Sequence, residues 1–269
     1  IRVIVGELSR IASHLVAVGT YSVDIGGFTG FLYCFRDRER VLDLLEMVSG
    51  SRMTFSYFRI GGVADDLPPE FFPTLDKFLH DLPSLCDEYD GLITGNEIFQ
   101  ARTKFVGIIP PDVAVNYGLT GPNLRASGVL YDLRKVRPYS VYDRFDFEVP
   151  LGKNGDCFDR FAIRIKEIRQ SARIIRQAVD GLPEGPIMAK VPRVIKPPKG
   201  EAYAEIESSK GVFGCYVVSD GSTQPYRVHF RRPSFINLGY LEKLLEGWKI
   251  ADVIAILGSL DIVLGEVDC

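Results

Sequence analysis

The chain has 269 residues, with 32 Lys and Arg against 35 Asp and Glu and a formal charge of −3. At about 150 residues per domain, this length suits one or two domains with a sizeable core. An apolar share of 46% and a charged share of 25% exclude wholesale disorder. The near balance of charge excludes a broad polycationic surface, so no nucleic-acid partner is expected. The longest apolar runs, such as residues 253–257, are far shorter than the roughly 20 residues of a membrane span. The chain is therefore not expected to cross a bilayer by itself.

The chain begins at Ile1 without an initiator Met or a signal-peptide pattern, and we expect a fragment of a longer protein. Its five cysteines are scattered and form no C-x-x-C pair, and its three histidines lie far apart. Because zinc and iron–sulfur sites need closely spaced ligands, no metal site is expected. A reducing compartment is predicted.

Helical spacing dominates the first half of the chain. Residues 2–18 are predicted to form a helix with Val3, Ile4, Leu8, Ile11, Leu15 and Val18 on one face. Glu7, Arg10 and His14 share another stripe of the same helix. The next predicted elements are a glycine turn over 24–30, helices over 31–49 and 71–94, a short strand over 104–109 and a helix over 112–116.

The second half changes character. Residues 116–150 show no sustained period, and a loop of that length is typical of a packed, functional surface. The elements predicted after it are a helix over 156–179, an extended connector over 183–200, strands over 201–207, 212–219 and 226–231, and helices over 240–245 and 250–257. The predicted fold class is mainly α with a smaller α+β portion. Its predicted parts are a mainly helical body over 1–182 that contains the irregular Arg, Tyr and Gly-rich segment, a Pro-rich connector over 183–200, and antiparallel strands with C-terminal helices over 201–269.

Nucleotide and hydrolase motifs are absent from the sequence. No G-x-G-x-x-G, G-x-x-x-x-G-K-[ST] or G-x-S-x-G occurs, so direct binding of NAD or ATP is not expected. His14 is interpreted as a hydrogen-bonding helix residue and not as a catalytic base. Asp24 is either a helix-end cap, which is favoured, or a carboxylate in a cavity.

The arginines leave two interpretations open. Those between residues 36 and 59 and between 134 and 144 alternate with carboxylates. They form either solvated ion pairs, each worth little, or a partly buried lattice at a subunit interface.

Ordered blocks along the whole chain match one family. They are residues 7–15, 23–26, 38–39, 50–53, 58–63, 116–118, 121–122, 124–128, 132–135, 138–139, 141–142, 155–157, 159–160, 169–171, 211–214, 219–221, 251–258 and 261–268. They resemble the D-type hydrophilic subunit of NADH-quinone oxidoreductase, which is the quinone-site subunit of respiratory complex I. The resemblance implies a fold like the large subunit of nickel–iron hydrogenases. Val263 and Glu266 stand where that hydrogenase protein has cysteines, so the metal site cannot form and its cavity is open to a quinone headgroup.

The resemblance also implies site residues. Asp24 matches an aspartate that pairs with a histidine beside the quinone, and is given the catalytic, proton-linked role. Phe31, Asp261 and Val263 match other quinone-binding positions; Phe31 and Val263 would contact the ring, and Asp261 would support the C-terminal turn. The partner histidine and a quinone-binding tyrosine are expected in a segment before Ile1. The family usually has Arg at the position of Cys269.

The implied enzyme is a proton-translocating NADH:quinone oxidoreductase with quinone as its substrate. NAD, FMN and iron–sulfur clusters would be held by partners, which are the subunit with the terminal cluster, other peripheral-arm subunits and membrane-arm subunits. The expected location is peripheral, on the cytoplasmic side of the plasma membrane or the matrix or stroma side in an organelle. The alternatives are a membrane-bound hydrogenase or a ferredoxin- or deazaflavin-linked relative, and a non-catalytic docking scaffold.

Overall fold

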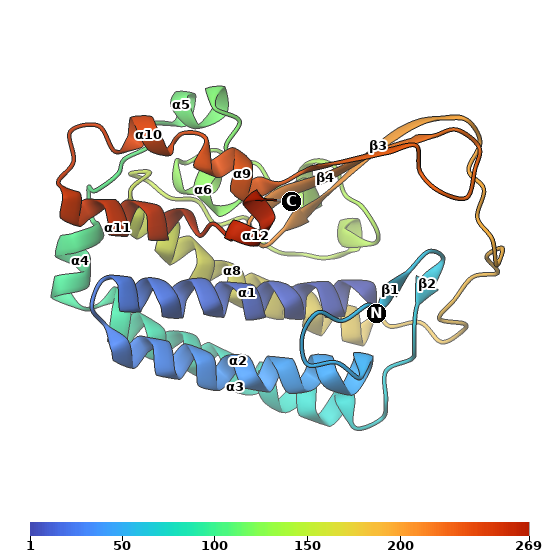
Figure 1. The fold of residues 1–269 in the computed structure, drawn as a ribbon. Helices are drawn as coiled ribbons and strands as arrows, with labels where there is room; N and C mark the ends of the chain where they lie inside the picture. Colours follow the sequence, from blue (N-terminus) through green and yellow to red (C-terminus); the bar gives the residue numbers. More distant parts are fainter. Residues whose placement is uncertain (269) are drawn as a thin grey trace.

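The computed structural model describes residues 1–268, and its body is built from four long helices that lie side by side (Figure 1). They are α1 (Arg2–Asp24), α2 (Phe28–Ser49), α3 (Phe71–Tyr89) and α8 (Cys157–Asp180). Helix α1 packs against both α2 and α8 and so forms the centre of the body. The four helices expected in these regions are confirmed, and α1 is longer than predicted because its helix continues as far as Asp24.

Helix α1 is a core helix. Its predicted apolar face, from Val3 to Val18, is buried. By length and a mean hydropathy of 1.3 it could span a membrane, but 72% of the relevant window is buried inside the protein. Its interior also holds the charged side chains of Glu7 and Arg10, which are costly in lipid and are paired here. Burial against α2 and α8 therefore accounts for the apolar composition of α1.

Shorter elements connect and cover the long helices. These are β1 (Phe58–Arg59), β2 (Gly62–Val63), η1 (Asp90–Thr94), α4 (Glu97–Thr103), α5 (Pro111–Asn116), α6 (Pro122–Ala126), α7 (Leu133–Val136) and η2 (Tyr142–Arg144). Strands β1 and β2 form a two-residue antiparallel pair. The segment predicted as a packed irregular loop thus contains short helices, and its Arg125 and Arg134 side chains are fully buried in the body.

A three-stranded antiparallel sheet follows the connector, with strand order β3–β4–β5. Its strands are β3 (Gly200–Ser208), β4 (Gly211–Ser219) and β5 (Arg227–Arg231), which confirms the three predicted strands. One end of the sheet reaches into the body and the other projects away from it (Figure 1). The last elements are α9 (Pro233–Leu238), α10 (Leu241–Leu244), α11 (Ile250–Leu260) and α12 (Leu264–Val267). Helix α11 packs on α1 and α8, and Cys269 lies outside the described residues.

The strand predicted over residues 104–109 is wrong. The backbone turns there, with Phe105 at a φ of 61°. The Phe105 N–H donates to Asp156 Oδ2 at 2.8 Å, and the Ile109 N–H donates to the Gly155 carbonyl at 2.9 Å. The apolar run therefore bonds to the loop before α8 and not to a strand. The coarser fold class, mainly helical with small sheets, is confirmed.

Candidate functional site

Asp24 is the last residue of α1, where the chain turns into α2. Gly27 is the N-cap residue of α2, and no side chain caps that helix end, so the favoured interpretation of Asp24 as a helix cap is wrong. The carboxylate lies beside α11, because a Cβ atom added to Gly258 would stand 2.8 Å from Asp24 Oδ2. Partial burial raises the pKa of Asp24 above its ordinary value. The residue is exposed and carries a carboxylate that protonates more readily than usual.

Phe31 lies in the first turns of α2, within a short aromatic row. Its ring centroid is 4.1 Å from that of Phe35, and 5.9 Å from that of Phe28, which is exposed. Gly30 allows this end of α2 to pack closely, because a Cβ at that position would collide with Ile93 and Ser22. The first turns of α2 thus present an aromatic surface a few residues after Asp24 in the chain.

Asp261 directly follows α11 and adopts a left-handed backbone conformation with a φ of 55°. Its carboxylate accepts a hydrogen bond from Lys210 Nζ at 2.6 Å and lies 3.3 Å from Arg164 Nε. Both cations are largely buried. A non-glycine residue in this conformation carries a cost of order 1–3 kcal/mol, and the two ion pairs offset it. Lys210 and Arg164 were not predicted from the sequence.

Val263 is the N-cap residue directly before α12, and its side chain is 46% exposed. Its N–H donates to Ser234 Oγ at 3.3 Å, and the Ser234 hydroxyl in turn donates to Glu266. The positions where the resemblance places cysteines thus carry a solvent-facing apolar side chain and a carboxylate engaged by a serine. Neither offers the soft sulfur ligand that a nickel–iron site requires.

The four candidates form two pairs that approach each other. Asp24 and Phe31 belong to the α1–α2 hairpin, whereas Asp261 and Val263 follow α11. Gly258, which touches Asp24, precedes Asp261 by about one helical turn. Within residues 1–268, no hydrogen bond or ion pair joins Asp24 to the other three. The proximity of Asp24 to Gly258 is therefore the contact that relates the two pairs.

Two cavities within residues 1–268 are not lined by any of the four candidates. One of about 100 Å³ near the α1–α2 turn is lined by Ser22, residues 25–27, Leu92, Ile93, Asn96, Ile98 and Phe99. One of about 480 Å³ lies at the opposite end of α1, between Ile1 and residues 181–187. A ligand site for a drug-sized molecule is typically about 300–1,000 Å³. We refer to Asp24, Phe31, Asp261 and Val263 together as the candidate wall, and their role in a ligand site stays a prediction.

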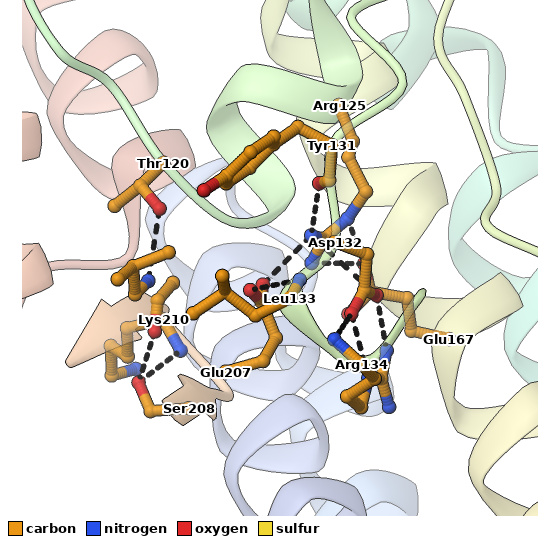
Figure 2. A network of polar contacts seen from close by, with 12 residues as sticks. Thr120, Arg125, Tyr131, Asp132, Leu133, Arg134, Glu167, Glu207, Ser208 and Lys210 are labelled. Carbon is orange, nitrogen blue, oxygen red and sulfur yellow. Dashed lines mark hydrogen bonds and ion pairs between the residues drawn. The ribbon is translucent and has the colours of Figure 1, made fainter. Parts of the chain in front are cut away.

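A buried network of charges lies inside the body (Figure 2). Arg125 donates to Glu167 Oε1 and to Glu207 Oε1, each at 2.8 Å. Arg134 bonds to Asp132 at 2.7 Å and to Glu7 at 3.1 Å. With Asp261 and its partners, the network has as many cations as carboxylates: Arg10, Arg125, Arg134, Arg164 and Lys210 against Glu7, Asp132, Glu167, Glu207 and Asp261.

Burial and ion pairing compete in setting the pKa values of this network. Desolvation raises the pKa of Glu7, but Arg10 and Arg134, with hydrogen bonds from Ser171 and Tyr142, bring it down to about 2. The pKa of Glu167 is likewise lowered, because Arg125 and His14 outweigh desolvation. The carboxylates of Glu7 and Glu167 are therefore ionised and depend on their cationic partners.

His14 belongs to this network. Its Nε2 lies 2.8 Å from Glu167 Oε2, while its buried Nδ1 has no hydrogen-bond partner among the described residues. Burial lowers the pKa of His14 although Glu167 opposes the shift. The interpretation of His14 as a hydrogen-bonding helix residue agrees with this geometry.

The arginines divide between the two interpretations left open by the sequence. Arg134 is fully buried and paired with Asp132 and Glu7. Arg52 pairs with Glu39 at the surface. The exposed group thus forms surface ion pairs and the buried group a lattice inside this chain, whereas the predicted place of that lattice at a subunit interface stays a prediction.

Comparison with known proteins assigns the chain to a family. The family model described as respiratory-chain NADH dehydrogenase, 49 kDa subunit, matches residues 24–199 and 191–269. The chain belongs to this family, which confirms the resemblance found in its sequence.

Individual relatives agree over the full chain. A protein of Desulforamulus reducens, named as the D-type subunit of NADH-quinone oxidoreductase, is 70% identical over 100% of this chain and 73% of its own length. Proteins of the same name from Carboxydothermus hydrogenoformans and Clostridium beijerinckii are 61% and 58% identical over 100% of this chain. They are matched over 74% and 72% of their own lengths.

Proposed function

We propose that this chain is the quinone-site subunit of an NADH-quinone oxidoreductase, in which it forms one wall of the cavity where quinone is reduced. The observation that carries the proposal is the approach of the α1–α2 turn, with Asp24 and Phe31, to the end of α11, with Asp261 and Val263. The relatives' names supply the reaction and its electron donor. The electrons reach the quinone from an iron–sulfur cluster held by a partner subunit, which also covers the open side of the wall.

The chemistry of the wall suits a quinone. Reduction of a quinone to a quinol consumes two electrons and two protons, and both quinone oxygens gain a proton. Asp24, with its raised pKa, can hold a proton next to the ring and compensate the charge that develops on it. Phe31 and Val263 would present apolar surface to the ring, whereas Asp261, paired with Lys210 and Arg164, would support the turn after α11. Asp24 is thus the proposed catalytic residue, and the other three bind or shape the site.

The proposal extends to assembly and ancestry. The fold is proposed to derive from the large subunit of nickel–iron hydrogenases, with a helical body over 1–182, a connector over 183–200 and a C-terminal part over 201–269. The chain is proposed to sit in the peripheral arm, on the cytoplasmic or matrix side, held by membrane-arm subunits. A hydrogenase activity would need thiolates, and Val263 provides no ligand atom in their place.

Substitution within the assembled complex tests this function. Asp24→Asn should lower the rate of NADH:decylubiquinone reduction and change the sensitivity to quinone-site inhibitors, while NADH:ferricyanide reduction, which needs no quinone, stays unchanged. If both the quinone reductase rate and inhibitor binding were untouched, the assignment of Asp24 would be overturned. If no quinone or inhibitor contacted this chain in the complex, the chain would be a docking scaffold.

A further inference from the structure

The turn between β3 and β4 is half-buried against the body, although hairpin turns normally lie at the surface. Strand β3 ends at Ser208 and β4 begins at Gly211, so that only Ser209 and Lys210 form the turn. Figure 2 shows Ser208 and Lys210 at this end of the sheet, next to the buried network. Lys210 carries the ammonium group that holds Asp261.

The Arg10 side chain of α1 donates hydrogen bonds to backbone carbonyls at this turn. Its Nη1 donates to the Ser208 carbonyl at 2.8 Å, and its Nη2 donates to the Glu207 carbonyl at 2.6 Å. Its Nε is 3.2 Å from Glu7, which neutralises its charge. Arg10 is only 4% exposed. A rigid guanidinium fork can make this two-point contact, whereas a lysine ammonium cannot reproduce it.

Other elements hold the turn from the remaining sides. Ser209 Oγ donates to Ser13 Oγ of α1 at 2.8 Å, and Asn237 Nδ2 of α9 donates to the Lys210 carbonyl at 3.2 Å. The backbone of Gly211 touches that of Gly121, where an added Cβ would stand 2.4 Å from Gly211 Cα. Gly211 also has a φ of +135°, and a Cβ on it would meet Thr120 Cγ2 at 2.6 Å. The backbone of Lys210 is therefore fixed relative to α1 and α9.

We propose that Arg10 is a positioning residue for the quinone site, which acts by fixing the β3–β4 turn so that Lys210 holds Asp261 at the end of α11. The inference rests on the proposed function, because it takes Asp261 as part of the quinone wall. Arg10 does not contact Asp261 itself. Its effect passes through two steps, from the guanidinium to the turn backbone and from Lys210 Nζ to the Asp261 carboxylate. A lysine side chain loses rotamer freedom when it is fixed in one ion pair. If the backbone of the turn is already fixed, forming the ion pair costs no additional backbone entropy.

Quinone kinetics of the assembled complex test the proposal. The perturbing variants are Arg10→Lys, which keeps the charge next to Glu7, and Gly211→Ala, which displaces the turn. Each should raise the KM for decylubiquinone about threefold to tenfold, the effect of loosening one group that shapes the site. NADH:ferricyanide reduction should stay unchanged, because it does not use the quinone site.

Two control variants are matched to these. Ser9 precedes Arg10 on α1, and Ser9→Ala removes a hydrogen bond to the Val5 carbonyl of the same helix. Gly221→Ala alters a glycine of φ +92° outside the strands, in the turn between β4 and β5. Both controls should leave the KM for decylubiquinone unchanged. Should Arg10→Lys fail to assemble, Ser13→Ala, which removes the contact with Ser209, takes its place.

A double-mutant cycle separates positioning from general stability. If Arg10 acts through Asp261, Arg10→Lys should add little to the KM of Asp261→Asn, because the path is already broken. Additive effects of the two substitutions, or an unchanged KM in both Arg10→Lys and Gly211→Ala, would overturn the proposal. If Lys210→Met and Asp261→Asn themselves left the KM unchanged, the assignment of the quinone wall would fail instead. The two failures are thus distinguishable.

Discussion

The Asp24 carboxylate at the end of α1 lies against Gly258 of α11, where an added Cβ would stand 2.8 Å from Asp24 Oδ2. Residues 24 and 258 come from opposite ends of the chain, and their contact joins the α1–α2 turn to the element that precedes Asp261 and Val263. Only a residue without a side chain permits this approach. The proposed catalytic carboxylate thus depends on a glycine that the sequence did not identify as part of the site.

Gly258→Ala is predicted to displace Asp24. The new methyl group would also lie 2.9 Å from Tyr21 Cδ2, a buried ring that cannot move easily. NADH:decylubiquinone reduction by the complex should fall severalfold, because a misplacement of about 1 Å can cost up to two orders of magnitude in rate. Gly6→Ala on α1 is the control, since no atom lies within 4 Å of its added Cβ. Equal activity of the two variants would show that the contact is unimportant.

The role of Asp24 itself predicts a charge effect. Asp24→Asn keeps the shape but cannot take up a proton, so the rate of quinone reduction should fall about 10²-fold or more if the group acts as a general acid. Asp43→Asn, an exposed carboxylate on α2 away from the turn, should keep the parental rate. The measurement is the steady-state rate with saturating decylubiquinone. A parental rate for Asp24→Asn would refute the proton-linked role.

The buried network predicts a large difference between two glutamates. Glu167→Gln removes the charge that faces Arg125 and His14 in the interior, and loss of one member of a buried ion pair costs about 3–5 kcal/mol. Glu39→Gln removes an exposed partner of Arg52 and should cost less than about 1 kcal/mol. Urea unfolding followed by circular dichroism compares the two free energies. Similar losses would mean that the network does not carry the stability assigned to it.

Acid should destabilise the chain through Glu7. Its pKa falls from 4.5 to about 2 on folding, so its contribution is complete above pH 4.5 and is lost as the pH falls toward 2. At about 1.4 kcal/mol per pKa unit, the loss is about 3 kcal/mol. His14, whose pKa is also lowered on folding, adds to acid destabilisation below its ordinary pKa of 6.5. The urea midpoint of unfolding should decrease as the pH is lowered from 6.5 toward 2. In Glu7→Gln this decrease should be smaller. An unchanged slope in that variant would contradict the assignment.

Local sequence patterns predicted the helices well. The apolar stripe of α1, from Val3 to Val18, predicts a helix without knowledge of the elements that pack against it. The stripe is buried, as expected. The strand predicted over 104–109 was wrong because the backbone N–H groups of this run donate to the loop before α8. Such tertiary hydrogen bonds leave no periodic pattern in the sequence.

The candidate site was less accessible from the sequence. Asp24, Phe31, Asp261 and Val263 came from the family resemblance, and their pattern alone favoured a helix cap for Asp24. Lys210 was visible only as a turn residue, since its partner Asp261 lies 51 positions further along the chain. The contact between Asp24 and Gly258 likewise requires the fold before it can be seen.

Photo-labelling of the intact complex with an azido-quinone tests the central claim most directly. The account predicts label on this chain in two peptides, one containing Asp24 and Phe31 and the other containing Asp261 and Val263, and competition by decylubiquinone. Label that is absent from both peptides, or that falls instead on the connector 183–200, would contradict the assignment of the quinone wall.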